Sequence, residues 1–327
     1  MGARRCHLDC AAWGACGYAS WHTNGTPLGG RNVCEGTVTV ELIEQAQAWR
    51  ERLDACRSKG QQVGLVPTMG ALHGGHMSLI RRAAGECDVV AVTDYVNPLQ
   101  FSATEDLTVY PRDLETDCRL AEEAGASFVF APSVEQMWPQ PGRTTVHVEG
   151  LTDAMEGASR PGHFDGVTTI VAKLFALAGP CWAYFGEKDF QQLTVVRRMT
   201  ADLSLPVEVI GCPTVRATDG LALSSRNGYL SEEEREVAPQ MYYALLAGKR
   251  AIEEDAVSEP QRVIDLMVDS ISRHPQFRLD YAEVADPDDL ARPRRIDSEV
   301  RLFMAARLGN ARLIDNVAAN PPQPSDS

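Results

Sequence analysis

The chain has 327 residues, and 44% of them are hydrophobic, so it is long enough to bury a sizeable core and to divide into two domains. The 31 Lys and Arg residues are outnumbered by 45 Asp and Glu, and the formal net charge of −14 excludes the broad basic face of a general nucleic-acid binder. No stretch approaches the roughly 20 apolar residues of a membrane span, and no signal peptide is recognisable, so we expect a soluble cytoplasmic protein without a membrane partner.

The first 35 residues lack the apolar spacing of a helix or a strand, so we predict a poorly ordered N-terminal extension at residues 1–35. A small zinc site is the alternative, because four cysteines and two histidines fall in this segment, although their spacings match no standard zinc pairing. These residues are Cys6, His7, Cys10, Cys16, His22 and Cys34.

Strand and helix patterns alternate between residues 36 and 214. Helices are predicted at 40–56, 74–86, 115–125, 165–179 and 189–203. Short apolar strands are predicted at 62–68, 87–96, 127–133, 144–150, 182–188 and 206–215. This alternation favours an α/β fold with a Rossmann-like, doubly wound parallel sheet. Ligands bind such sheets beyond the carboxyl ends of the strands, and four motifs fall there: PTMG, VNPLQF, FGEKD and PTVR.

The pattern changes after residue 215. Two charged amphipathic helices are predicted at about 231–255 and 258–274, followed by strand-like runs at RLDYAEVAD and RLFMAARLGNARLIDNV. We therefore predict a smaller α+β domain at residues 215–318. Residues 319–327 are rich in Pro and Ser, which indicates a disordered tail.

The stretch VPTMGALHGGHMSLI places two histidines where a predicted strand passes into a helix. Gly70, Gly74 and Gly75 remove side chains there, so backbone N–H groups can approach an anion at the positive end of the helix. His73 and His76 project from one side of that turn and can donate to phosphate oxygens as charge develops on them. The alternatives are a zinc site completed by a distant ligand, or two surface histidines without a special role.

Two further stretches carry groups that suit phosphates. In FGEKD, Gly186 permits close backbone approach and Lys188 supplies a mobile positive charge. Asp189 is either the N-cap of the helix that follows or a nucleotide contact. The polar segment ALSSRN, which we expect to be flexible, offers three donors in succession or forms an ordinary turn. These donors are Ser224, Ser225 and Arg226.

The motifs stand in the order and spacing typical of the pantoate–β-alanine ligase family, and this resemblance covers about residues 38 to 317. It rests on PTMGALHGGHMSLI, VNPLQF, YPR, RPGHFDGV, FGEKDFQQL and PTVRATDGLALSSRNGYL. The HxGH turn is similar to the HIGH element of the nucleotidyltransferase superfamily, and LSSR resembles its KMSKS loop. The resemblance implies an AMP-forming ligase that joins (R)-pantoate to β-alanine through pantoyl adenylate, with ATP and Mg²⁺ as substrate, and that forms a homodimer.

The resemblance also implies roles for individual residues. His76 is the proton donor during adenylation, and His73, Lys188 and Arg226 complete the catalytic set. The implied ATP contacts are Met69, Gly70, Ala71, Leu72, His73, Gly74, Gly75, His76, Gly186, Glu187, Lys188, Asp189, Val215, Leu223, Ser224, Ser225 and Arg226. No protein side chain is implied as a direct metal ligand.

Gln100 and Gln192 are implied to bind pantoate, and Gln100 also β-alanine, since an amide offers both a donor and an acceptor to a hydroxy acid. Arg160 in SRPGHF suits a carboxylate or phosphate, or else a surface ion pair. The chain departs from the family at Asp94 and Tyr95, where apolar residues are usual. A carboxylate inside a buried strand is costly unless it is paired, so Asp94 is expected to lie near the end of its strand.

Two other functions are compatible with the histidine turn. A different nucleotidyltransferase would share the turn but not FGEKDFQQL together with SSRN. A non-catalytic nucleotide-binding regulator would be expected to lack His76, Lys188 or Arg226, and all three are present. Formation of AMP from ATP, pantoate and β-alanine separates these functions.

Overall fold

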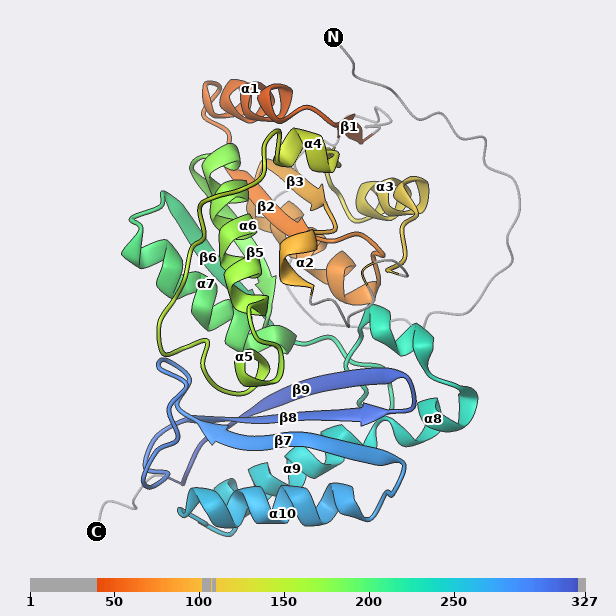
Figure 1. Ribbon diagram of the computed structural model, residues 1–327, viewed down its shortest axis with the longest axis vertical. Helices are drawn as coiled ribbons and strands as arrows, with labels where there is room; N and C mark the ends of the chain where they lie inside the picture. The colour runs from red at the N-terminus through yellow and green to blue at the C-terminus, as the bar shows by residue number, and fades with distance from the viewer. Residues whose placement is uncertain (1–39, 102–106, 108–109, 323–327) are drawn as a thin grey trace, which may run out of the picture.

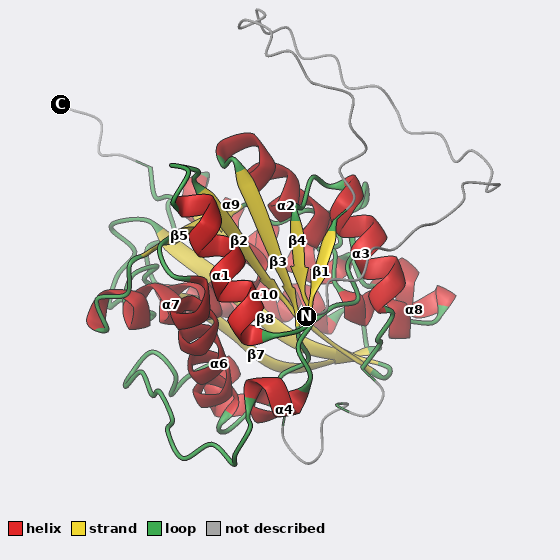
Figure 2. Cartoon of the chain, turned by 90° about the horizontal axis from the view of Figure 1, so that it is seen from above, coloured by secondary structure: helices red, strands yellow, loops and turns green. Residues whose placement is uncertain are grey.

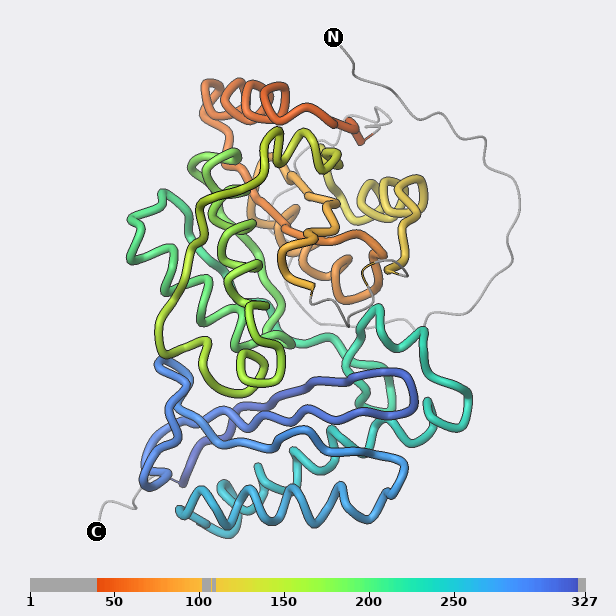
Figure 3. Tube along the Cα trace, viewed as in Figure 1, coloured from red at the N-terminus to blue at the C-terminus, as the bar shows by residue number. Residues whose placement is uncertain are grey.

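The computed structural model describes residues 40–101, 107 and 110–322, which form two units stacked on each other (Figure 1). The Cα trace in Figure 3 runs through the first unit from red to green and through the second from cyan to blue. The predicted extension at 1–35, with its cysteines and histidines, lies outside the described residues, as does most of the predicted tail. The predicted division into 36–214 and 215–318 remains a proposal.

The first unit is built on a six-stranded parallel sheet in the order β1-β4-β3-β2-β5-β6. The strands are β1 (Glu41–Ile43), β2 (Val63–Thr68), β3 (Val89–Asp94), β4 (Phe128–Phe130), β5 (Cys181–Gly186) and β6 (Val207–Cys212). The strand order reverses between β2 and β5, and ligands of doubly wound sheets bind at such a switch point. The predicted doubly wound α/β fold is confirmed.

Helices cover both faces of this sheet, as Figure 2 shows from above. The longer ones are α1 (Ala46–Arg57), α2 (Gly74–Glu86), α3 (Leu114–Glu123), α6 (His163–Ala178) and α7 (Phe190–Asp202). Short helices are η1 (Pro98–Gln100), α4 (Val134–Met137), α5 (Glu156–Ser159) and η2 (Glu187–Asp189). One apolar core lies under α1, α6 and α7, for example at Trp49 and Phe175, and a second lies under α2 and α3, for example at Ile80 and Ala121.

The second unit is the predicted smaller α+β domain. It holds η3 (Ser225–Tyr229), α8 (Glu232–Val237), α9 (Gln240–Glu253), α10 (Pro260–Ser272), β7 (Phe277–Ala285), β8 (Val300–Leu308) and β9 (Ala311–Ala319). The three strands form an antiparallel sheet in the order β7-β8-β9. In Figure 1, α9 and α10 lie along one side of this sheet, and its other side is turned toward the first unit. Strands β8 and β9 thereby contact η2, which directly follows β5.

Three predicted elements are wrong in detail. Residues 41–43 begin no helix but form β1, which pairs with Phe128–Phe130 in parallel register. The run at 144–150 is not a strand, because threonines of α6 take its backbone groups: Val146 donates to Thr169 Oγ1 at 2.9 Å and accepts from Thr168 Oγ1. The single helix predicted at 231–255 is divided into α8 and α9, with Pro239 at the N-cap of α9.

Candidate active site

The histidine turn joins β2 to α2. Gly70 has a φ of +77°, and a Cβ there would clash with Asp94 Oδ1. His73 is the N-cap of α2: its Nδ1 accepts a hydrogen bond from Gly75 N at 3.1 Å, so the ring proton is on Nε2. The ring centroids of His73 and His76 lie 4.1 Å apart. One histidine thus shapes the turn that holds both imidazoles together.

Burial keeps both imidazoles neutral at physiological pH. It lowers the pKa of His73 to about 4, with the charge of Lys188 adding to the effect. It lowers the pKa of His76 to about 3, with His73 as the next cause. Among the described residues, buried His76 Nδ1 also has no hydrogen-bond partner. At physiological pH these neutral rings are therefore hydrogen-bonding groups.

The FGEKD motif follows β5, at the same edge of the sheet. Lys188 Nζ lies 3.6 Å from an oxygen of Asp189. The Glu187 carboxylate pairs with Arg301 of β8, with Oε2 3.4 Å from Nη2. Asn316 of β9 donates to the carbonyl oxygens of Glu187 and Lys188, both at 2.8 Å, so the second unit helps to fix the motif. Sequence reasoning missed Asn316, although it lies in the strand-like RLIDN run.

Asp189 does not behave as the predicted N-cap. It occupies the N-cap position of α7 with φ −100° and ψ 58°, but its side chain makes no capping hydrogen bond. The alternative interpretation of this carboxylate, a nucleotide contact, stays a prediction.

The SSRN segment follows a stretch that is hydrogen-bonded at both of its ends. Val215 O accepts from Leu223 N at 2.9 Å, and an isolated bridge pairs Arg216 with Ala222. Arg216 also holds Asp315 of β9 through two hydrogen bonds, at 2.6 and 2.9 Å. These contacts hold the loop that carries Ser224, Ser225 and Arg226 beside the histidine turn.

Gln100 lies at the end of η1 and is almost completely buried. Its Nε2 contacts Met69 Sδ at 2.8 Å, and its Oε1 accepts from Asn97 Nδ2 at 3.2 Å. Buried Asn97 also donates to Gly166 O at 3.0 Å, so it positions the predicted amide and was missed from the sequence.

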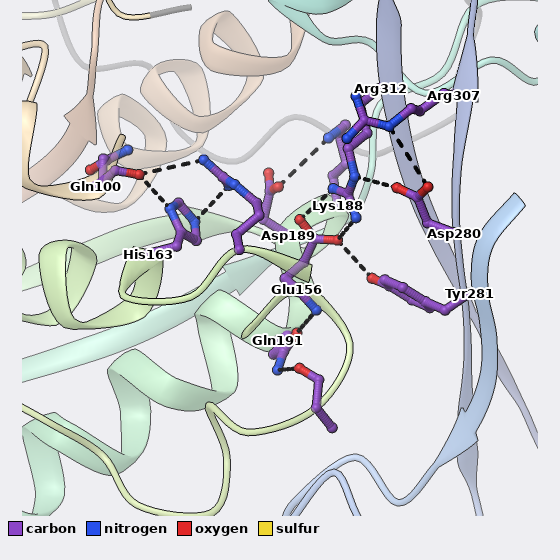
Figure 4. A network of polar contacts seen from close by, with 12 residues as sticks. Gln100, Glu156, His163, Lys188, Asp189, Gln191, Asp280, Tyr281, Arg307 and Arg312 are labelled. Carbon is purple, nitrogen blue, oxygen red and sulfur yellow. Dashed lines mark hydrogen bonds and ion pairs between the residues drawn. The ribbon is translucent and has the colours of Figure 1, made fainter. Parts of the chain in front are cut away.

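The RPGHF motif supports the backbone of Gln100. Arg160 Nη1 lies 2.8 Å from His163 Nε2, and His163 Nδ1 lies 2.8 Å from Gln100 O (Figure 4). Because arginine only donates, His163 is neutral there and donates from Nδ1. Arg160 thus makes a contact inside the site.

Asp94 is the last residue of β3, as expected, and it is partly buried. Burial and the neighbouring carboxylate of Asp117 raise the pKa of Asp94 to about 7. Asp117 accepts hydrogen bonds from Ala71 N at 2.8 Å and Leu72 N at 2.7 Å. The two carboxyl groups therefore lie directly beneath the histidine turn.

The motifs meet in two neighbouring cavities. The inner cavity, about 230 Å³, lies at the carboxyl ends of β2 and β5, and the outer cavity, about 570 Å³, lies between the two units. The predicted residues that line the inner cavity are Met69, His73, Gly75, His76, Gln100, Gly186, Lys188, Asp189, Gln192, Val215, Leu223, Ser224, Ser225 and Arg226. Gly70, Ala71, Leu72, Gly74 and Glu187 do not line it. Both cavities share Arg160, His163, Lys188, Asp189, Gln192, Ser224 and Arg226.

A network of charged groups joins the two units beside the outer cavity (Figure 4). Glu156 of α5 accepts two hydrogen bonds from Arg312 of β9, at 2.7 and 2.8 Å, and one from Tyr281 of β7 at 2.9 Å. Gln191 of α7 holds α5 in place by accepting from Glu156 N at 3.0 Å. The wall of the outer cavity is therefore built from both units.

Among the described residues, no group of three or more His, Cys, Asp or Glu side chains could hold a metal ion. None of the helices in the described ranges has the length and hydropathy needed to cross a membrane.

Comparisons with known proteins agree with one another. The family model described as pantoate-beta-alanine ligase matches residues 41–318. The pantothenate synthetase of Moorella thermoacetica is 49% identical over 278 residues, 85% of this chain and 98% of that protein. The crystal structure of the Thermus thermophilus pantothenate synthetase has a TM-score of 0.81 at 47% identity and covers 86% of this chain and 99% of its own. The Francisella tularensis pantoate-beta-alanine ligase, complexed with beta-gamma ATP and β-alanine, has a TM-score of 0.70 at 31% identity, with 84% and 96% covered.

Proposed function

Because this chain belongs to the pantoate-beta-alanine ligase family, we propose that it joins pantoate to β-alanine in an ATP-dependent reaction. The enzyme is a ligase that forms an amide bond, with pantothenate, AMP and pyrophosphate as products and pantoyl adenylate as intermediate. The observation that carries this function is the convergence of HxGH, FGEKD, SSRN and two glutamines on one cavity at the sheet's switch point.

ATP is proposed to bind with its phosphates between the histidine turn and the SSRN loop. Lys188 and Arg226 lie in the wall common to both cavities and bring positive charge to an otherwise acidic protein. The inner cavity alone is smaller than the usual 300–1,000 Å³ of small-molecule sites, so we propose that the reactants also extend into the outer cavity. The proposed ATP contacts are the turn from Met69 to His76, the stretch from Gly186 to Lys188, Val215, and the loop from Leu223 to Arg226.

Pantoate is proposed to bind in the inner cavity between Gln100 and Gln192. Both glutamines line that cavity, and the Asn97 and Met69 contacts of Gln100 hold its amide in one orientation. A buried amide that pairs with substrate hydroxyls discriminates strongly against acids that lack them, because the amide is then left unpaired. Gln100 is proposed to contact β-alanine as well.

In the first step, a carboxylate oxygen of pantoate attacks the α-phosphorus of ATP, and the bond to the bridging oxygen breaks as pyrophosphate leaves. We propose that neutral N–H groups of His73 and His76, with the charge of Lys188, stabilise the negative charge that develops on the phosphates. His73 Nε2 carries the proton that this role requires, because its Nδ1 accepts from Gly75. A bound polyanion would favour protonation of both rings, so the proton-donor role of His76 is proposed for the ATP complex.

In the second step, the amine of β-alanine attacks the acyl carbon, and the bond from that carbon to the AMP oxygen breaks. The bonding electron pair leaves with AMP, and the nitrogen loses its extra proton to solvent. Adenylation is required first because a carboxylate is a poor acyl donor, whereas AMP is a good leaving group.

Three further features are part of the proposal. Mg²⁺ enters with ATP as part of the substrate. At such sites the ion is usually held by the substrate phosphates and by water, with few ligands from the protein. The protein forms a homodimer, and it works in the cytoplasm. Light scattering on the purified chain tests the oligomeric state, and ATP-dependent activity before and after EDTA, restored by Mg²⁺ alone, tests the metal.

The function is tested by incubating the purified protein with ATP, pantoate and β-alanine. We expect AMP and pantothenate in equal amounts, with no AMP when pantoate is omitted. A non-catalytic regulator would form no AMP, and a different nucleotidyltransferase would use ATP without any requirement for pantoate.

A further inference from the structure

The histidine turn has a backbone conformation that needs support from outside the turn. Gly70 and Ala71 have φ angles of +77° and +51°, and this left-handed region is costly for alanine because of its Cβ. Asp117 of α3 supplies the support. Its Oδ2 accepts a hydrogen bond from Ala71 N at 2.8 Å, and its Oδ1 accepts one from Leu72 N at 2.7 Å. Both oxygens of one carboxylate therefore anchor the turn that carries the two histidines.

A second carboxyl group, that of Asp94, faces this anchor from the last position of β3. A Cβ on Gly70 would lie 2.4 Å from Asp94 Oδ1 and 3.0 Å from Asp117 Oδ2, so the two side chains meet under the turn. They are hydrogen-bonded to each other. Because an ionised carboxylate only accepts hydrogen bonds, one of the two groups must carry a proton.

The surroundings assign this proton to Asp94. Both oxygens of Asp117 accept backbone N–H groups, so a proton on either would weaken the anchor. In the described part of the chain, no backbone N–H group donates to Asp94, and neither carboxyl group has a Lys or Arg ion-pair partner. Burial and the charge of Asp117 raise the pKa of Asp94 to about 7.

The other groups that surround Asp94 are uncharged. In β2, its partner in the parallel register is Thr68. On the chain before α3, Tyr110 faces Asp94, and burial raises the pKa of the Tyr110 phenol. Asp117 is therefore the charged group that acts on Asp94 among the described residues, and the two carboxyl groups titrate as a pair.

We infer that Asp94 is a positioning residue for adenylation: its protonated carboxyl group donates a hydrogen bond to Asp117 and so keeps the histidine turn in place. The inference rests on the proposed function, which supplies the reaction at that turn. When Asp94 loses its proton, it repels Asp117 and weakens the hold on Ala71 N and Leu72 N. Neither carboxyl group lines the two cavities, so Asp94 acts through Asp117 and touches no reactant.

The pH dependence has a definite direction. Protonated Asp94 supports the turn, so adenylation is favoured below the pKa of about 7 and is weakened as the pH rises through that value. The family usually has an apolar residue at this position. The response is therefore expected of this chain and not of the family as a whole.

The test compares Asp94→Asn with the wild type across a range of pH. The amide of the variant is uncharged and can donate to Asp117 at every pH, so it mimics the protonated acid. Adenylation is followed as pantoate-dependent exchange between ATP and pyrophosphate, without β-alanine. The ratio of kcat/KM for ATP in the two proteins cancels the ionisation of the substrates and of the histidines.

We expect this ratio, variant over wild type, to be about one at about pH 6 and roughly ten at about pH 8.5, the scale of a lost hydrogen bond to a charged group. Infrared spectra give a second measurement. The C=O stretch of a protonated carboxyl group should weaken in the wild type over this range, and that change should be absent from Asp94→Asn.

Two further variants complete the test. Asp117→Asn offers one acceptor in place of two, so its exchange should be slow at every pH. Asp202→Asn is the matched control, because exposed Asp202 lies at the far end of α7 and pairs with Arg198. It should keep the pH profile of the wild type.

Two outcomes would overturn the inference. One is a ratio of Asp94→Asn to wild type that stays constant across the pH range, which would show that the Asp94 proton has no part in adenylation. The other is exchange at the wild-type rate in Asp117→Asn, which would show that the turn does not need its anchor. Absence of pantoate-dependent exchange in the wild type would instead contradict the proposed function.

Discussion

Asp94 and Asp117 face each other beneath the histidine turn, and only Asp117 is used by the backbone of that turn. Since the folded-state pKa of Asp94 is raised to about 7, the folded protein binds its proton more tightly than the unfolded chain does. Protonated Asp94 therefore contributes to the free energy of unfolding below about pH 4, and this contribution is lost as the pH rises through about 7. His73 and His76 act in the opposite direction, because their lowered pKa values make the folded state bind fewer protons.

Asp94→Asn isolates the contribution of Asp94 from that of the histidines. We expect the variant to unfold with the same free energy as the wild type below about pH 4, and to be more stable by at least about 1 kcal/mol at pH 8. Urea unfolding of both proteins at a series of pH values measures the difference. A constant difference across that range would show that Asp94 is ionised in the folded protein at neutral pH.

The buried, neutral ring of His76 leads to a second prediction at the residue scale. His76→Ala removes a proposed hydrogen-bond donor to charge that develops on the phosphates, and such donors contribute about 10²–10³ in rate. We expect pantoate-dependent exchange to fall by that factor. His147→Ala is the control, because exposed His147 pairs with Asp165 and lies outside both cavities. A fall of less than about tenfold would argue against a role of His76 in adenylation.

At the level of elements, the first turn of α7 presents two adjacent glutamines in different directions. Gln191 is buried and holds the segment before α5 through Glu156 N, Leu151 O and Ala154 O, at 2.9 to 3.0 Å. Gln192 lines both cavities. A helix rotates by about 100° per residue, so neighbours in one turn contact different partners.

The two glutamines are therefore matched variants with opposite expected effects. Gln191→Ala should lower the free energy of unfolding by about 1–3 kcal/mol, because it leaves buried groups without partners. Gln192→Ala should keep its stability and raise the KM for pantoate at least tenfold, about 1.4 kcal/mol, with little change for ATP. Steady-state kinetics and urea unfolding of both variants test this division. If Gln192→Ala lost affinity for ATP and kept its KM for pantoate, pantoate would not bind in this pocket.

At the scale of the whole molecule, the Glu156–Arg312 pair connects the two units across the outer cavity. Glu156 is 7% exposed, and its carboxylate accepts hydrogen bonds from Arg312 and Tyr281 of the second unit. Removing one partner of a buried pair leaves an uncompensated charge, which costs about 3–5 kcal/mol. We expect Arg312→Met to lower the free energy of unfolding by that amount, and the addition of Glu156→Gln to recover part of it.

Urea unfolding of the two single variants and the double variant gives the coupling between them. Arg295→Met is the control, since Arg295 and Asp297 form an exposed pair that should contribute less than about 1 kcal/mol. If Arg312→Met costs no more than this control, the contact between the units does not depend on the Glu156 pair.

The sequence by itself determined the features that local patterns encode. The spacing of apolar residues predicts helices and strands wherever one face of the element is buried. Most elements between residues 62 and 319, and the doubly wound architecture, could therefore be predicted. The histidine turn, FGEKD and SSRN could be placed at the carboxyl ends of strands, because a short motif carries its chemistry within a few residues. The same local reasoning failed at residues 144–150, where an extended run is held by threonines of α6 and not by a strand.

Only the tertiary structure decided which distant groups surround each side chain. The strand β1 exists because residues 41–43 pair with residues 128–130, and Asn316 reaches the FGEKD backbone across more than a hundred residues of sequence. The pKa values of His76 and Asp94 depend on burial and on neighbours from other elements. Sequence alone allowed Asp189 to be a helix cap or a nucleotide contact, and only the structure shows that its side chain makes no capping bond and lines both cavities. The physical reason is the range of each effect. The apolar repeat of an element and the capping of a helix depend on residues that are close in sequence. Burial and electrostatic fields depend on every neighbour that the fold brings near.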